Sequence, residues 1–387
     1  MDTMTKIAKG NSLIANQQGQ SRNSGIELLR IMMMFYIIYG HAMSQSAIPK
    51  DIPIGNTILT YCFSFARAAT LCFMVLSGWY MNINQGIKDT YRKMIKLWIK
   101  FACELFLISW FCILKYDYDW NYLRLSFFPL SWRPLWYVAC YIMFLAFVPL
   151  INAAYKQLED DVSGRRMIAV VTGFMIFGLG TISPFLFGID ADRFPTFYSE
   201  LLVYIVVYIV VKFLKQDLER VPNLIWYLVL ILGFFFFVIV RSLYFLSAER
   251  GLIDRFLGMN YLRKFVGVFY SHIETLPLLL FSVSVIMLTK KIQFHSRIIN
   301  KISVCTISVY VIHQMPLLYP HLWDEIYRVN LFASKPILIF FLYMIFVFVT
   351  LYAVSFIIDT ILNNAIDFGE KMIYMSRHRK DSNSGQC

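Results

Sequence analysis

Charged residues are scarce in this chain. Asp, Glu, Lys and Arg together make up 16% of its 387 residues, whereas a typical soluble domain contains about 25%. Hydrophobic residues reach 58% and aromatic residues 17%, which suits surfaces that face lipid and the membrane interface. The shortage of charge argues against an ordinary soluble protein and indicates an integral membrane protein.

Other features are also missing from the sequence. Residues 1–24 contain no apolar core followed by a small-residue cleavage site, so we expect no cleavable signal peptide. The cysteines form no Cys-x-x-Cys pair, and none stands near a histidine at zinc-ligand spacing. We therefore expect no metal site and no disulfide framework. No internal repeat of fixed period and no second soluble domain is visible.

The net charge of +12 comes from short clusters of Lys and Arg between apolar segments. This distribution is typical of the cytoplasmic loops of a membrane protein, and we therefore expect no nucleic-acid partner. More basic residues fall on the cytoplasmic side when the N-terminus is placed there, so both termini are predicted to be cytoplasmic. The long basic loop 247–267 is the main exception.

Ten apolar segments approach the length of about 20 residues that a membrane helix needs. The predicted fold is an all-α integral membrane protein with about ten transmembrane helices. A cytoplasmic tail (1–23) precedes the transmembrane domain (24–362), and a second cytoplasmic tail (363–387) follows it. Four acidic or histidine residues lie within later segments, namely Glu104, Glu200, His272 and Glu274, and Glu104 is the one most expected to have a hidden basic partner. The predicted helices span 25–44, 58–81, 96–114, 134–152, 167–188, 196–214, 223–246, 268–289, 302–319 and 336–360.

The first predicted membrane helix contains three ionisable residues, Glu27, Arg30 and His41, within the stretch GIELLRIMMMFYIIYGHA. Ser24 and Glu27 form the pattern Ser-x-x-Glu before an apolar run, which is typical of a capping box. Glu27 therefore has a structural role available. Arg30 follows one turn later, where it can pair with Glu27 or extend to the lipid headgroups.

Arg30 and His41 are expected to share one face of this helix. The step of eleven residues between them brings the two side chains within about 20° of each other after three turns, roughly 16 Å apart along the axis. Ionisable groups inside a bilayer usually face a cavity or a partner, and histidine is well suited to proton transfer near neutral pH. His41 is therefore a candidate catalytic base, with an interfacial histidine as the alternative.

The chain from about residue 24 to residue 360 resembles the acyltransferase-3 family of multi-pass bacterial membrane acyltransferases. The first helix matches the family's opening pattern: an acidic residue, Leu-Arg, ten residues and then His. The resemblance is strongest to members that O-acetylate exopolysaccharide, capsule or O-antigen. Four later segments also match, in order: RAATLCFMVLSGWYM, TYRKMIKLWIKF, LWYVACYIMFLAFVPLIN and INKISVCTISVYVIHQMPLL.

The resemblance implies roles for the catalytic residues. His41 would deprotonate the acceptor hydroxyl or briefly accept the acyl group itself. Arg67 would stabilise the oxyanion that develops at the thioester carbonyl. Glu27 would orient Arg30, whose charge would help to bind the phosphates of the donor.

The resemblance also implies two binding regions. Arg92, Lys93 and Lys96 fall on the family's basic Arg-x-x-Arg segment and would bind acyl-CoA, although lysine lacks the bidentate geometry of arginine. An ordinary basic flank is the alternative. The acceptor pocket would contain Ser77, Trp136, Tyr310 and His313, with close helix packing as the alternative for Ser77 and Gly78.

The predicted function is transfer of an acetyl or other short acyl group from acyl-CoA to a hydroxyl of a cell-surface polysaccharide or its lipid-linked precursor. Acetyl-CoA would be a co-substrate, and no bound cofactor is expected. The resemblance further implies the bacterial cytoplasmic (inner) membrane and glycan-assembly proteins as neighbours. Two other classes stay open: a glycan or lipid-linked oligosaccharide transporter or flippase, whose intramembrane charges would look similar, and a membrane scaffold or sensor.

Overall fold

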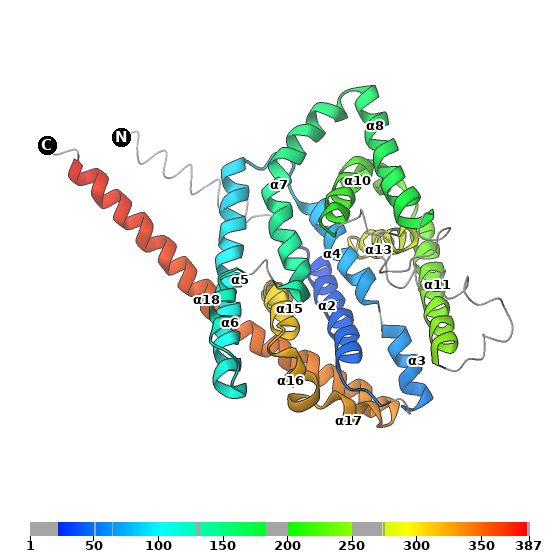
Figure 1. Cartoon of the computed structure of the whole chain (residues 1–387). Helices are drawn as coiled ribbons and strands as arrows, with labels where there is room; N and C mark the ends of the chain where they lie inside the picture. Colours follow the sequence, from blue (N-terminus) through cyan, green and yellow to red (C-terminus); the bar gives the residue numbers. More distant parts are fainter. Residues whose placement is uncertain are drawn as a thin grey trace.

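The computed structural model describes residues 22–49, 52–63, 65–128, 132–182, 200–249, 273 and 275–384. Over these ranges the chain forms helices and no strand (Figure 1), which confirms the predicted all-α class. The principal helices are α2 (Ser24–Gln45), α3 (Ile54–Phe63), α4 (Ala66–Tyr80), α5 (Ile87–Tyr116), α6 (Asn121–Ser126), α7 (Trp136–Glu159), α8 (Val162–Gly173), α10 (Glu200–Arg220), α11 (Asn223–Glu249), α13 (Leu276–Thr289), α14 (Arg297–Ile302), α15 (Thr306–Gln314), α16 (Tyr319–His321), α17 (Val329–Ala333) and α18 (Ile337–Ser384). The 3-10 helices η2 (Arg133–Leu135) and η4 (Ser303–Cys305) and the π-helices η3 (Phe174–Ile182) and η5 (Leu322–Ile326) complete the order.

Six of the described helices are long and apolar enough to cross a membrane, or seven if the bent pair Arg297–Gln314 and Tyr319–Ile326 forms one span. The chain is therefore a multi-pass membrane protein, but the predicted number of about ten spans is not confirmed. Two of the predicted segments correspond to α4 and α13, which have 15 and 14 residues. At 1.5 Å per residue such helices are about 21–23 Å long, shorter than the hydrocarbon core of about 30 Å.

Several predicted boundaries differ from the structure. The expected helix 58–81 is divided into α3 and α4, and Phe65 between them has a non-helical backbone. The helix α18 continues to Ser384, past the predicted helix end at 360. Some predicted regions lie outside the described ranges. They are most of the N-terminal tail, most of loop 247–267, parts of segments 167–188, 196–214 and 268–289, and the residues His272 and Glu274.

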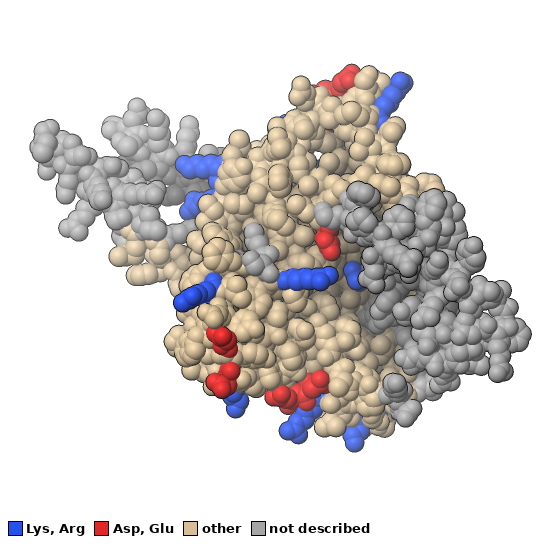
Figure 2. Space-filling model, viewed as in Figure 1, with Lys and Arg blue, Asp and Glu red and all other residues tan. Residues whose placement is uncertain are grey.

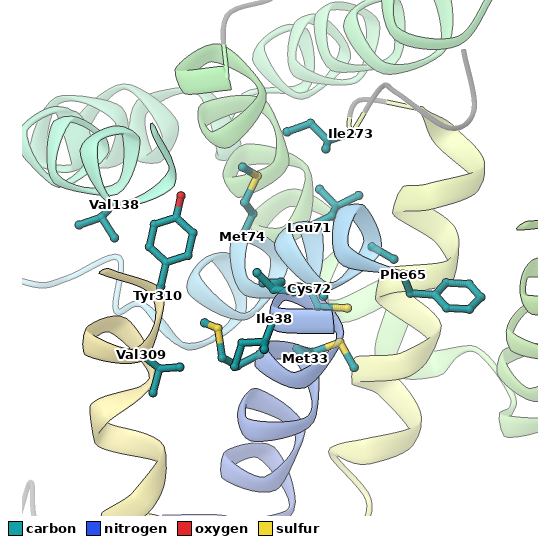
Figure 3. Packing of buried hydrophobic residues seen from close by; sticks show 14 of the residues in the cluster. Met33, Ile38, Phe65, Leu71, Cys72, Met74, Val138, Ile273, Val309 and Tyr310 are labelled. Atoms are coloured by element: carbon teal, nitrogen blue, oxygen red, sulfur yellow. The ribbon is translucent and has the colours of Figure 1, made fainter. Parts of the chain in front are cut away.

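The short helix α4 lies at the centre of the bundle and contacts α2, α10 and α13. Most of its apolar side chains, including Leu71, Cys72 and Met74, are fully buried. Figure 3 shows these residues beside side chains of α2, such as Ile38, in the same buried cluster as Tyr310 of α15. The helix α2 contacts both α4 and α15, and the ionisable residues of interest lie on these three helices.

The outer faces of the bundle are apolar. Leu232 on α11 and Leu338 on α18 are 67% and 65% exposed, and many other large apolar side chains of these two helices are also exposed. On the face shown in Figure 2 most of the described surface is uncharged. Exposed apolar area on this scale is unfavourable in water, so it indicates contact with lipid.

The α14–α15 segment ends inside the bundle. Met315, the residue after α15, has an extended backbone with φ −61° and ψ 120°. It precedes Pro316, and the proline ring disfavours a helical conformation of the residue before it. The chain then turns by 85° into α16 and η5. His313 and Gln314 therefore stand at the end of a half-helix, beside the C-terminal end of α2.

Candidate active site

A cavity of about 850 Å³ follows the length of α2. Its lining begins at Arg22, Glu27 and Arg30 and continues to His41 and Pro49. The 22 residues of α2 span about 33 Å, close to the thickness of the hydrocarbon core. Residues from α3, α4, α7, α11, α13 and α15 also line the cavity. The cavity thus joins the two ends of a membrane-crossing helix, and Arg30 and His41 share the face predicted from their spacing.

An ion pair organises the first end of the cavity. Nη1 of Arg30 donates to both carboxylate oxygens of Glu27, at 3.2 and 3.3 Å, as the spacing predicts. The hydroxyl of Ser303 donates to Oε2 of Glu27 at 2.6 Å, and Nε of Arg22 lies 4.0 Å from its Oε1. The buried carboxylate therefore holds Arg30 in place while leaving Arg30 and Arg22 in the cavity wall.

The predicted capping box at Ser24 and Glu27 is wrong. The N-cap of α2 is Asn23, whose side chain accepts from the backbone N–H of Gly25 at 2.9 Å. The hydroxyl of Ser24 instead accepts from the backbone N–H of Ser296 at 2.7 Å and donates to Oδ1 of Asn300 at 2.8 Å. The loop between α13 and α14 thus occupies the hydroxyl that a capping box would use, and Glu27 is free to pair with Arg30.

Two histidines meet at the second end of the cavity. Nδ1 of His41 lies 3.0 Å from Nε2 of His313, and Nδ1 of His313 lies 2.6 Å from the main-chain oxygen of Val309. A carbonyl oxygen can only accept, so Nδ1 of His313 carries its hydrogen. With His313 neutral, its Nε2 accepts the Nδ1–H of His41. This arrangement leaves the Nε2 lone pair of His41 available, and His41 lines the cavity.

Amide contacts brace this histidine pair. The side chains of Gln45 and Gln314 donate to each other's carbonyl oxygen, both at 3.3 Å. Nε1 of Trp323 donates to the same Gln45 oxygen at 2.9 Å. Gln45 is one turn beyond His41, and Gln314 is the neighbour of His313. The contacts therefore fix α2 against α15 at the level of the two imidazoles.

Arg67 enters the cavity from α4. It is the second residue of that helix and lines the cavity. No ion pair or hydrogen bond joins its guanidinium to another residue in the described part of the chain, and its charge is close enough to act on His41. An uncompensated charge among apolar helices is costly, so this guanidinium is available to a negatively charged group beside His41.

The other predicted pocket residues form the cavity wall. Ser77, Trp136 and Tyr310 line it. The hydroxyl of Ser77 donates to the main-chain oxygen of Phe73 at 2.9 Å, and Oη of Tyr310 donates to the main-chain oxygen of Pro134 at 3.0 Å. Both hydroxyl hydrogens are therefore used within the protein. Ser77 and Tyr310 can shape the pocket and accept hydrogen bonds, but they do not offer a free donor.

The structure does not bring the predicted acyl-CoA residues to the cavity. Arg92, Lys93 and Lys96 lie in the first three turns of α5, and none of them is in the cavity wall. Lys93 donates to Oε1 of Gln85 at 3.2 Å, and Lys96 pairs with Asp367 at 2.5 Å. These contacts fit the alternative of a basic flank. Arg22, for which the sequence predicted no role, lines the cavity beside Glu27 and Arg30 instead.

Comparison with known proteins gives one match. Residues 23–358 match the family model described as an acyltransferase domain, that of the acyltransferase-3 family. No curated protein and no solved structure gave a significant match. The matched region begins at the N-cap of α2 and includes every residue of the cavity wall except Arg22.

Proposed function

Because the chain belongs to the acyltransferase-3 family, we propose that it is a membrane O-acyltransferase. It moves an acetyl or other short acyl group from acyl-CoA to a hydroxyl of a cell-surface polysaccharide or of its lipid-linked precursor, in the cytoplasmic membrane of a bacterium. The observation that carries the proposal is the cavity that joins Arg30 to His41. The family match does not favour the transporter or flippase alternative.

The donor enters from the end that contains Arg22 and Arg30. The phosphates of acyl-CoA stay at this mouth, where guanidinium groups suit phosphate oxygens. The thioester arm extends along α2 toward His41. Glu27 holds Arg30 in position through its two hydrogen bonds. This arrangement replaces the predicted phosphate contacts of Arg92, Lys93 and Lys96 with contacts to residues of the cavity wall.

The transfer takes place beside His41. Its Nε2 removes the proton from the acceptor hydroxyl, and the oxygen attacks the thioester carbonyl. Arg67 stabilises the negative charge that forms on the carbonyl oxygen. When the intermediate collapses, the C–S bond breaks and the coenzyme A thiolate takes the proton from His41. An ester and a thiol result, so no proton is gained or lost overall.

His313 acts as a positioning residue in this reaction. While His41 holds the proton, its Nδ1–H continues to donate to Nε2 of His313, which stabilises the imidazolium. The carbonyl of Val309 keeps His313 in the accepting tautomer. An acyl group carried briefly by His41 would use the same Nε2 atom, and a quenched reaction analysed by mass spectrometry separates the two routes.

The first test combines genetics with mass spectrometry of the surface glycan. Wild type, a deletion strain, and the deletion strain carrying His41→Ala at matched membrane abundance are compared. We expect an acyl group that only the wild type carries. His295→Ala is the matched control, because His295 is exposed and outside the cavity wall, and it should restore acylation.

Purified protein in lipid nanodiscs provides the second test. We expect thiol release from acetyl-CoA to depend on an added glycan acceptor and to disappear in His41→Ala. Normal acylation by His41→Ala would remove the base role from His41. A deletion strain that acylates its glycan normally but fails to export it would refute the enzyme and support a transporter.

A further inference from the structure

A second group of ionisable side chains lies away from the cavity, where α5, α15 and α18 meet. It consists of Lys100 and Glu104 on α5, Ser308 on α15, and Asp359 on α18. Glu104, Ser308 and Asp359 are 1%, 0% and 4% exposed. None of the four lines the cavity, so the acyl-transfer steps described above do not use them.

Asp359 has donors on both carboxylate oxygens. Nζ of Lys100 forms an ion pair with Oδ1, and Nδ2 of Asn363 donates to Oδ2 at 2.7 Å. The hydroxyl of Ser308 also lies 2.8 Å from Oδ1. These contacts identify Asp359 as the ionised acid of the group, because its negative charge is matched by an ammonium and two further donors.

Glu104 has a different environment. Its Oε1 forms a short hydrogen bond with the hydroxyl oxygen of Ser308. Its Oε2 is fully buried and has no hydrogen-bond partner in the described part of the chain. An ionised carboxylate with one bare oxygen in an apolar interior would be strongly unfavourable.

The single hydroxyl hydrogen of Ser308 determines how Glu104 and Asp359 are protonated. A serine hydroxyl has one hydrogen, and an ionised carboxylate can only accept. Ser308 contacts both Glu104 and Asp359, and it can donate to only one of them. The other contact is a hydrogen bond only if that carboxyl carries a proton and donates it to the serine oxygen.

We propose that Glu104 is a proton-binding site: it is held as a neutral carboxylic acid that donates to Ser308, while Ser308 donates to the Asp359 carboxylate. The group is then electrically neutral, with one ammonium and one carboxylate. Among the described residues, Cys103 and Cys305 are further titratable side chains within electrostatic reach of the group. The inference does not depend on the acyl-transfer reaction.

The bound proton has a mechanical consequence. Ser308 and His313 belong to the same short helix, α15. Loss of the proton would leave two carboxylates competing for one hydroxyl hydrogen, so Ser308 on α15 would lose one of its two hydrogen bonds, and Glu104 on α5 would repel Asp359 on α18. The bound proton therefore helps to hold α15, the helix that carries His313, in place.

Infrared spectroscopy tests the proposal directly. The full chain in lipid nanodiscs at neutral pH is compared with Glu104→Gln, which keeps the shape and a hydrogen-bond donor. We expect a carbonyl band of a protonated carboxylic acid in the wild type and its loss in the variant. The band should persist in Asp367→Asn, a matched control on α18 whose side chain is 54% exposed.

Two outcomes would overturn the proposal: a wild-type spectrum without the band, or a band that Glu104→Gln leaves unchanged. Ser308→Ala covers the case in which Glu104→Gln does not fold. Without the serine oxygen the Glu104 hydroxyl loses its acceptor, so the band should shift in frequency. A band that does not shift would exclude Glu104 as its source. The band should also persist in His41→Ala, which separates this proposal from the enzyme mechanism.

Discussion

Replacement of His313 tests the mechanism most sharply. In the proposed reaction the Nε2 atom of His313 accepts from Nδ1 of His41 across 3.0 Å, and this bond strengthens when His41 becomes positively charged. A hydrogen bond to a charged group contributes about 1.5–3 kcal/mol. Since each 1.36 kcal/mol is a factor of ten in rate, His313→Ala should lower kcat by about 10- to 150-fold.

The conservative variant separates chemistry from packing. The carbonyl oxygen of a glutamine can stand where Nε2 of His313 stands and accept the same hydrogen bond, so His313→Gln should recover most of the lost kcat. KM for acyl-CoA should change little in either variant, because His313 is not in the wall of the cavity. The assay is thiol release by purified protein at matched amounts of folded material.

Three results would refute this reasoning. Equal losses in His313→Ala and His313→Gln would mean that size and packing matter, and not the hydrogen bond. A change confined to KM would place His313 in substrate binding. An inactive His313→Ala beside an active His41→Ala would transfer the role of catalytic base to His313.

Further predictions concern the two ends of the cavity and the start of α2. Arg67→Ala should lower kcat by about 10²- to 10³-fold, the usual cost of removing an oxyanion donor, and steady-state kinetics with an unchanged KM would support this role. Arg30→Ala should raise KM for acyl-CoA, whereas Lys93→Ala should leave it unchanged; a larger KM effect from Lys93→Ala would restore the basic segment of α5 as the phosphate site. Gly25→Ala should lower the amount of folded protein, because the added Cβ would lie 2.2 Å from the main-chain oxygen of Ile292; normal abundance in a membrane immunoblot would contradict that packing.

Local spacing was sufficient to predict part of the candidate site. The Glu27–Arg30 pair is one helical turn apart, and the common face of Arg30 and His41 depends only on the periodicity of α2. The opening pattern of the family lies in the same helix. Interactions of this kind depend on one element, so the sequence of that element is enough.

Contacts between distant segments could not be predicted in the same way. The contact of His41 with His313 depends on how α15 is turned against α2, and periodicity says nothing about that. Ser24 and Glu27 had the pattern of a capping box, but Ser296, 272 positions away in the chain, uses the serine hydroxyl. At Ser24 the tertiary contact therefore replaced the local capping interaction that the sequence pattern predicted.

The basic residues show a related limit. The sequence of α5 contains a basic cluster with Arg92, Lys93 and Lys96, and a cluster at a helix end suits either phosphate binding or the lipid headgroups. The sequence of α5 does not distinguish the two roles, and in the structure these residues lie outside the cavity wall. Arg22 belongs to a polar segment, and apart from its charge nothing in that segment predicted that Arg22 would line the cavity.

The distance in sequence between the two histidines has a consequence for biosynthesis. His41 and His313 are separated by 272 positions, and chains grow at about 5–20 residues per second. His313 is therefore made about 14 to 54 s after His41. Nascent chains that stop before α15 contain the opening pattern but lack the imidazole that fixes the tautomer of His41. Activity should thus rise only after α15 has been made, and fragments truncated before α15 should be much less active than the full chain even when they insert.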